Sequence, residues 1–201
     1  MFKNLVRRRR FFFAPMVMAG LLWGAGVTAQ ATAVGPGNAV PQQLGNSIVG
    51  DNHYHSLSNN NPDAGPVSAL EREGACANAT GYADMGAFDS DHASQRWMFD
   101  DNGDGTATIR DSCNPVLVLA APTDTGPVKM VAYPNQANAK YTKWTVTQTS
   151  TDAFGRAVYA IVSQATGKAL ESCGTAVGST VVVDSPNNSA GQAWTVVYTT
   201  P

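Results

Sequence analysis

Three tryptophans that recur at similar intervals constrain the fold of this 201-residue chain more than any other feature. Trp97, Trp144 and Trp194 are spaced 47 and 50 residues apart, and each one precedes a short apolar run. A rare residue that returns at a near-constant interval predicts an internal repeat whose units bury their apolar faces against one another. A large aromatic side chain with a single N–H donor suits a core position, so we expect all three tryptophans to be structural.

The segments between the tryptophans predict β-strands. Short apolar runs alternate with turn residues, and no stretch of about ten residues follows a helical period. The third unit is the clearest, with strands predicted at 157–163, 168–172, 179–184 and 192–198. The other two units follow the same plan, which predicts an all-β fold of twelve strands in three four-stranded repeats. The predicted domain covers 67–201, with repeats at about 67–99, 100–148 and 149–201.

The first 66 residues differ in character from the rest. Residues 1–31 combine an arginine run, an apolar stretch and small residues at Ala29 and Ala31, which predicts a secretory signal peptide. An uncleaved membrane anchor is the alternative. Residues 32–66 are rich in Gly, Pro, Asn and Ser and predict a flexible linker, in which we expect the pair His53 and His55 to be solvated. We expect a secreted protein, extracellular or periplasmic, with no stable membrane insertion after signal cleavage.

Charge and cysteine usage restrict the class of protein further. The formal net charge is −2, and loss of the basic head would make it more negative, so we expect no nucleic-acid partner. Cys76, Cys113 and Cys173 predict one disulfide and one free thiol in an exported chain, and any of the three pairs could form. The sequence contains no hydrolase nucleophile motif, phosphate loop or metal-hydrolase motif, so we expect neither enzyme activity nor a cofactor.

One acidic segment, residues 100–111, permits two interpretations. Asp100, Asn102, Asp104 and Asp111 fall on ligand positions of a calcium loop. However, the flanking residues predict strands and not helices, and Asp-Gly and Asn-Gly are typical of tight hairpin turns. We favour the hairpin and expect no metal site.

With this plan the sequence resembles the ricin-type β-trefoil lectin family, in which a Q-x-W motif closes each of three repeats. Residues 95–97 and 192–194 match the motif completely, whereas Thr142 replaces the glutamine in the middle repeat. The segment GKALE at 167–171 resembles the family's second-strand motif G-K-C-L-D, and GACAN at 74–78 resembles it more weakly. The resemblance implies a β-trefoil, a six-stranded barrel capped by three hairpins with pseudo-threefold symmetry.

The resemblance also implies where a sugar would bind in each repeat. The family's sites combine an acidic residue after the second strand's leucine, an aromatic platform on the third strand, and polar residues near the glutamine. A carboxylate accepts hydrogen bonds from sugar hydroxyls, and an aromatic ring packs on a C–H face. The positions carried over to repeats one and three are Asn78, Phe88, Asp89, Gln95, Glu171, Asp184, Asn188 and Gln192.

The three repeats retain different parts of this set. Asn78 replaces the acid in repeat one, and no aromatic residue stands near Val183 in repeat three. Repeat two has Val118 at the acid position and Thr142 at the glutamine, and only Tyr133 remains as a platform. We therefore expect repeats one and three to bind a carbohydrate or glycoconjugate without catalysis. The alternative is a trefoil whose sugar sites have decayed and whose loops bind a protein partner.

Overall fold

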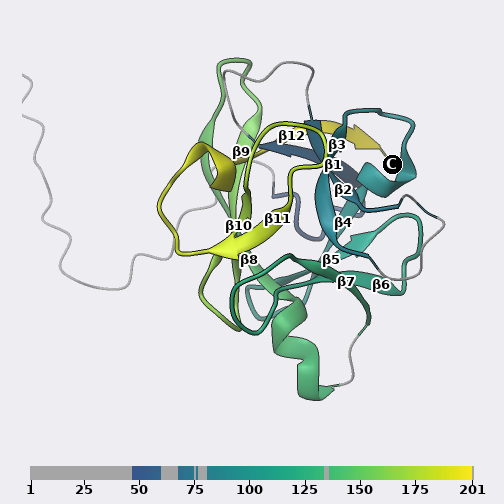
Figure 1. Cartoon of the computed structure of the whole chain (residues 1–201), viewed down its shortest axis with the longest axis vertical. Helices are drawn as coiled ribbons and strands as arrows, with labels where there is room; N and C mark the ends of the chain where they lie inside the picture. The colour runs from purple at the N-terminus through teal and green to yellow at the C-terminus, as the bar shows by residue number, and fades with distance from the viewer. Residues whose placement is uncertain (1–46, 60–67, 75, 77–80, 134–135, 201) are drawn as a thin grey trace, which may run out of the picture. The chain divides into compact units, whose positions relative to one another are not determined.

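A computed structural model describes residues 47–59, 68–74, 76, 81–133 and 136–200 (Figure 1). The predicted signal peptide, residues 1–31, lies outside the described residues. The described residues form twelve β-strands and three short 3-10 helices. None of the helices among them is long and apolar enough to cross a membrane.

Six of the strands close into an antiparallel barrel. The barrel strands are β1 (Tyr54–Asn59), β4 (Trp97–Asp101), β5 (Ala107–Asp111), β8 (Lys143–Thr151), β9 (Ala157–Ser163) and β12 (Trp194–Thr200). Pairing runs from β1 to β4, β5, β8, β9 and β12, and β12 pairs with β1 again. Closure leaves no barrel strand with a free edge.

The other six strands form three hairpins. They are β2 (Ser68–Arg72) with β3 (Ala83–Ala87), β6 (Leu117–Ala120) with β7 (Lys129–Ala132), and β10 (Ala169–Ser172) with β11 (Val181–Asp184). Backbone bridges join each hairpin to the other two, at Tyr82↔Lys129, Asp84↔Thr180 and Pro127↔Val182. Each repeat therefore supplies two barrel strands and one hairpin, which is the β-trefoil plan expected from the sequence.

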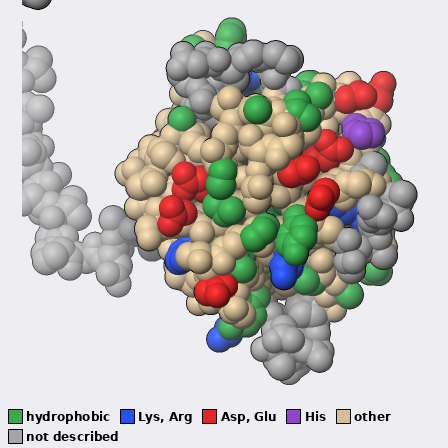
Figure 2. Space-filling view, in the orientation of Figure 1, with side chains coloured by type: hydrophobic (Ala, Val, Ile, Leu, Met, Phe, Trp, Pro, Cys, Tyr) green, Lys and Arg blue, Asp and Glu red, His purple; other side chains and the backbone are tan. Residues whose placement is uncertain are grey.

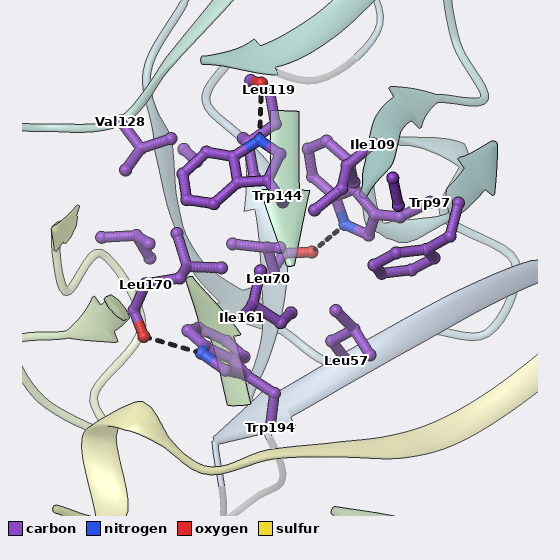
Figure 3. Close-up of a cluster of buried hydrophobic side chains, with 14 of the residues drawn as sticks. Leu57, Leu70, Trp97, Ile109, Leu119, Val128, Trp144, Ile161, Leu170 and Trp194 are labelled. Carbon is purple, nitrogen blue, oxygen red and sulfur yellow. Dashed lines mark hydrogen bonds between the residues drawn. The ribbon is translucent and has the colours of Figure 1, made fainter. Parts of the chain in front are cut away.

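The core lies where the barrel meets the hairpins (Figure 3). Trp97, Trp144 and Trp194 are fully buried, and each indole N–H donates to a backbone carbonyl of its own repeat at 2.9–3.0 Å. Each repeat also contributes leucine or isoleucine side chains to the same cluster. Because the indole donor is satisfied, the tryptophans contribute apolar area without the cost of an unpaired polar group.

The domain begins earlier than the sequence pattern predicts. Residues 54–59, assigned to the flexible linker, form β1 and complete the barrel between β12 and β4. The linker interpretation is therefore wrong over this range. The prediction that His55 is solvated is also wrong, because this residue is 2% exposed. The approximate repeat boundaries at 99–100 and 148–149 fall inside β4 and β8, a few residues before each strand ends. The pattern missed β1 because Leu57 is its only aliphatic residue.

Residues 100–111 form the hairpin that joins β4 to β5. Gly103 and Gly105 have φ values of 73° and 82°, a left-handed backbone that the turn requires. The acidic side chains have partners within the protein: Asp100 pairs with Arg110, and Asp104 pairs with Lys143 at 2.5 Å. The acidic side chains of this hairpin are thus used within the turn and the barrel wall.

The structure also resolves the cysteine pairing that the sequence left open. Cys76 and Cys113 form a disulfide that joins repeat one to the start of repeat two. Cys173 is a free, exposed thiol that follows β10. Burial and the charges of Glu171 and Asp184 raise the pKa of this thiol, so the reactive thiolate is disfavoured at neutral pH.

Candidate functional site

The indole hydrogen bonds identify equivalent positions in the three repeats. Trp97, Trp144 and Trp194 donate to the carbonyls of Leu70, Leu119 and Leu170, respectively. The residues that follow these leucines are Glu71, Ala120 and Glu171. Repeats one and three therefore both carry an acid at this position, and repeat two carries alanine.

This register corrects two of the positions taken from the sequence. The acid position of repeat one is Glu71 on β2, and not Asn78, which lies outside the described residues. The corresponding position of repeat two is Ala120, and not Val118, which is fully buried. The sequence contained a signal for the correct register, because the tripeptide Ala-Leu-Glu occurs at 69–71 and again at 169–171.

In repeat one, three polar groups surround the carboxylate of Glu71. Oε2 accepts a hydrogen bond from Gln95 Nε2 at 3.1 Å, and Oε1 accepts one from Ser94 Oγ at 2.9 Å. His92 Nδ1 lies 3.3 Å from Oε1. The Glu71 side chain is 15% exposed, so its carboxylate is held in a fixed position but remains open to solvent on one side.

The amide group of Gln95 is already hydrogen-bonded within the protein. In addition to Glu71, its Nε2 donates to the carbonyl of Ala87 at 2.7 Å, and its Oε1 accepts from the N–H of Asp89 at 3.0 Å. The side chain is fully buried. Gln95 was predicted as a sugar contact by resemblance; in the structure its amide group is buried and holds the carboxylate of Glu71.

Repeat three reproduces this arrangement. Gln192 Nε2 donates to Glu171 Oε2 at 2.7 Å and to the carbonyl of Ser185 at 3.0 Å, and the N–H of Asn187 donates to Gln192 Oε1 at 2.9 Å. Ser189 Oγ lies 3.4 Å from Glu171 Oε1, at the position that His92 occupies in repeat one. Two distant parts of the chain thus build the same glutamine-held carboxylate.

The hairpin register also locates the aromatic position. Leu70, Leu119 and Leu170 pair with Met85, Met130 and Val183, so the position three residues further on is Phe88, Tyr133 or Pro186. In repeat one this position is occupied by Phe88, which is half-buried. Val183 was the expected platform position of repeat three, but its side chain is 2% exposed and belongs to the core.

The remaining predicted residues lie beside these carboxylates. Asp89 is exposed, and its Oδ1 accepts the N–H of Asp91 at 2.9 Å, which shapes the turn after Phe88. Asp184 is exposed at the end of β11. Asn188 has a φ of 58° and lines a hollow of about 240 Å³ together with residues that include Pro186 and Gln192.

The arrangement around Glu71, called site one below, contains a pair of acids that is unfavourable for folding. Glu71 pairs directly across the hairpin with Asp84, so two acids stand opposite each other. Burial, followed by the charges of Glu71 and Glu73, raises the pKa of Asp84 to about 6. Any larger residue at position 86 would also displace the Glu71 side chain, because a Cβ there would lie 1.4 Å from Glu71 Oε2. Unfavourable arrangements of this kind are concentrated at functional sites.

Repeat two lacks the carboxylate and the glutamine. Ala120 and Thr142 stand in their places, and the Thr142 hydroxyl donates to the carbonyl of Ala139 at 2.9 Å. These smaller side chains leave a hollow of about 580 Å³ that Tyr133 and Tyr141 help to line. The third pseudo-equivalent position therefore has a different shape and a different chemistry.

Comparison with solved structures places this architecture among known folds. The chain is similar to the designed three-fold symmetric protein ThreeFoil (TM-score 0.57, 22% identity, 73% of this chain and 99% of the other). It is also similar to the Macrolepiota procera ricin B-like lectin solved with lactose (TM-score 0.52, 19% identity, 72% and 93%). A third similarity is to the exo-β-1,3-galactanase 1,3Gal43A of Clostridium thermocellum (TM-score 0.57, 21% identity, 75% and 31%).

The galactanase match covers only about a third of that longer chain. No family model and no curated protein matches the sequence. The structural similarities, together with the closed barrel, the three hairpins and the repeated Leu–Trp hydrogen bond, identify the fold. The chain has the β-trefoil fold of the ricin B-like lectins.

Proposed function

We propose that the chain is a carbohydrate-binding module with two shallow sites, one at Glu71 and one at Glu171. The observation that carries this proposal is the repeated glutamine-held carboxylate. Each glutamine donates one N–H to a glutamate and is itself held by two backbone groups. A partly exposed acid whose position is fixed in this way is typical of a preorganised binding group. The ricin B-like fold supports the same conclusion.

The carboxylates supply the polar part of recognition. An ionised carboxylate has about four acceptor sites, and the neighbouring side chains occupy only some of those of Glu71 and Glu171. The remaining lone pairs accept hydrogen bonds from adjacent sugar hydroxyls. Charge-assisted hydrogen bonds of this kind are stronger than neutral ones, which suits a solvent-exposed site where water competes.

The two sites differ in their apolar part. Phe88 directly follows Ala87, whose carbonyl accepts a hydrogen bond from the Gln95 that holds Glu71, whereas Pro186 stands at the equivalent position of repeat three. An aromatic ring packs better than proline on the C–H face of a pyranose, so site one binds the more tightly of the two. Two sites on one molecule raise the apparent affinity for a multivalent glycan surface.

The proposed module works outside the cytosol and without catalysis. The Cys76–Cys113 disulfide is typical of oxidising compartments, in agreement with the predicted signal peptide. N-terminal sequencing of the mature protein is expected to begin at Thr32, directly after Ala31. An intact Met1 on a membrane-bound protein would contradict this part of the proposal.

A glycan array tests the function directly. We expect the purified wild-type protein to bind a restricted set of glycans, and the double variant Glu71→Gln/Glu171→Gln to lose them. The matched control is Asp101→Asn, an exposed acid on the β4–β5 hairpin that should leave binding unchanged. Failure of the wild type to bind any glycan, with capture of a specific protein instead, would favour a protein-binding trefoil.

A further inference from the structure

The hollow of repeat two is the trefoil position that the carbohydrate proposal leaves unused. It lies between the β6–β7 hairpin and the 3-10 helix η3 (Gln136–Thr142), and its volume is about 580 Å³. Ala120 and Thr142 occupy the places that glutamate and glutamine fill in the other repeats. A volume of this size suits a small organic ligand.

The floor of this hollow presents few groups that could hydrogen-bond a sugar. It is lined by Ala120, Ala121 and Val131, and the Thr142 hydroxyl already donates to Ala139. The N–H of Ala121 is also used, because it donates to the carbonyl of Tyr141 at 2.9 Å. A sugar hydroxyl placed against this floor would lose its hydrogen bonds to water without replacement, which is costly. The floor therefore favours an apolar ring.

Tyrosine side chains supply further contacts for such a ring. Tyr133 and Tyr141 both line the hollow, and Tyr133 is 60% exposed although its backbone is fixed by a hydrogen bond to Val116. Aromatic rings prefer offset or edge-to-face contact with other aromatic rings. An exposed tyrosine beside an apolar floor therefore indicates a planar aromatic ligand.

The charges around the hollow indicate the sign of that ligand. Lys129 lines the hollow, and no ion pair holds its ammonium group among the described residues. The ammonium group lies 5.6 Å from the ring centre of Tyr82, which is outside the lining, so the side chain has to turn from that ring to reach a carboxylate in the hollow. The ammonium group of Lys140 lies 5.1 Å from the ring centre of Tyr141. Asp124 is the one acid in the lining. Figure 2 shows one face of the molecule, on which Asp and Glu form several separate patches and Lys and Arg form a few smaller ones.

We propose that the hollow of repeat two binds a planar aromatic compound that carries a carboxylate. The ring lies on the apolar floor beside Tyr133, and the carboxylate pairs with Lys129 at the rim. Glu71 and Glu171 would repel an anion at the equivalent positions of repeats one and three, so this ligand is specific to repeat two. The trefoil thus combines two polar sites with one aromatic-acid site.

Calorimetric titration of the full chain with 2-naphthoate tests this proposal. We expect one equivalent to bind, and Tyr133→Ala to weaken binding about fivefold or more through loss of aromatic contact. Lys129→Met should weaken the binding of 2-naphthoate severalfold but leave the binding of neutral 2-naphthylmethanol unchanged. Ala120→Glu should abolish binding, because it fills the hollow and adds a negative charge, whereas Val177→Ala, at an exposed residue outside the hollow, is the control.

Three results would overturn the proposal. The first is that wild type does not bind 2-naphthoate, and the second is that 2-naphthoate binding survives both Tyr133→Ala and Ala120→Glu. The third is tighter binding of glucuronate than of 2-naphthoate at this position, which would assign the hollow to an acidic sugar. Melting curves for each variant establish whether loss of binding reflects loss of the fold. The exposed variants at Tyr133 and Lys129 should melt as wild type does, whereas Ala120 is only 7% exposed, so Tyr133→Ala decides the test if Ala120→Glu melts early.

Discussion

At the scale of single residues, Gly86 shows how closely the hairpin approaches the acid of site one. A methyl group added there would lie 1.4 Å from Glu71 Oε2 and 2.8 Å from Gln95 Nε2. Gly86→Ala should therefore displace the carboxylate and weaken sugar binding at site one about tenfold or more, since a binding group must be held within about 0.5 Å. Binding at Glu171 is the internal control. Unchanged affinity at site one would show that its carboxylate position is not essential.

Asp84 makes the folding stability of the protein depend on pH. Its pKa is raised from 3.8 to about 6, so the folded state holds the proton more tightly than the unfolded state between these values. Stability therefore falls as pH rises through this window, and the full penalty is present above it. Asp84→Asn removes the penalty, so the variant should be more stable than wild type at pH 7 and should lose that advantage below pH 4.

Chemical denaturation at pH 3.5, 5 and 7 provides the measurement for Asp84→Asn. Asp91→Asn is the control, because the Asp91 side chain is 95% exposed. A variant that is no more stable than wild type at pH 7 would show that burial and the neighbouring acids do not disfavour the Asp84 charge.

At the scale of secondary-structure elements, β1 determines where the domain begins. It pairs with both β12 and β4, and Leu57 is fully buried. A chain that starts at residue 67 would leave the barrel open and both neighbouring strands with a free edge. We expect this chain to aggregate or to show no cooperative melting by circular dichroism, whereas one that starts at residue 47 should melt cooperatively. Cooperative melting of the shorter chain would contradict the role of β1.

The elements also show what the sequence could and could not predict. Trp97, Trp144 and Trp194 were informative because a rare, large residue at constant spacing has few explanations other than a repeated core position. β1 was missed because the buried polar residues His55, Ser56, Ser58 and Asn59 surround its single leucine. Their burial depends on barrel strands that are distant in sequence, so no local hydrophobic pattern in the sequence indicates it.

The same reasoning explains the misplaced acid of repeat one. In the sequence, the acid position of repeat one was assigned by matching GACAN at 74–78 to the family's second-strand motif. In the structure, the equivalent positions are given by the leucine whose carbonyl accepts the indole hydrogen bond. The separation of leucine and tryptophan is nearly constant, at 27, 25 and 24 residues. Glu71 was therefore predictable from Ala-Leu-Glu, but its hydrogen bonds to Ser94 and Gln95 were not.

At the scale of the whole molecule, one fold presents three equivalent positions with unequal chemistry. The three tryptophans and their leucines keep the core threefold, because the barrel and hairpins pack around a shared centre. The residues that follow the leucines do not face that shared centre in the same way, so Glu71, Ala120 and Glu171 can differ while the core stays threefold. Two of the three positions carry the proposed sugar sites, so we expect each molecule to bind two glycans.

The stoichiometry of glycan binding tests that claim most directly. Titration calorimetry with a glycan selected on the array should give two equivalents for wild type and one for either Glu71→Gln or Glu171→Gln. The double variant should give none, and the effects should add because the two sites share no partners. Stoichiometry that stays at the wild-type value in the double variant would place sugar binding elsewhere on the molecule and contradict the account.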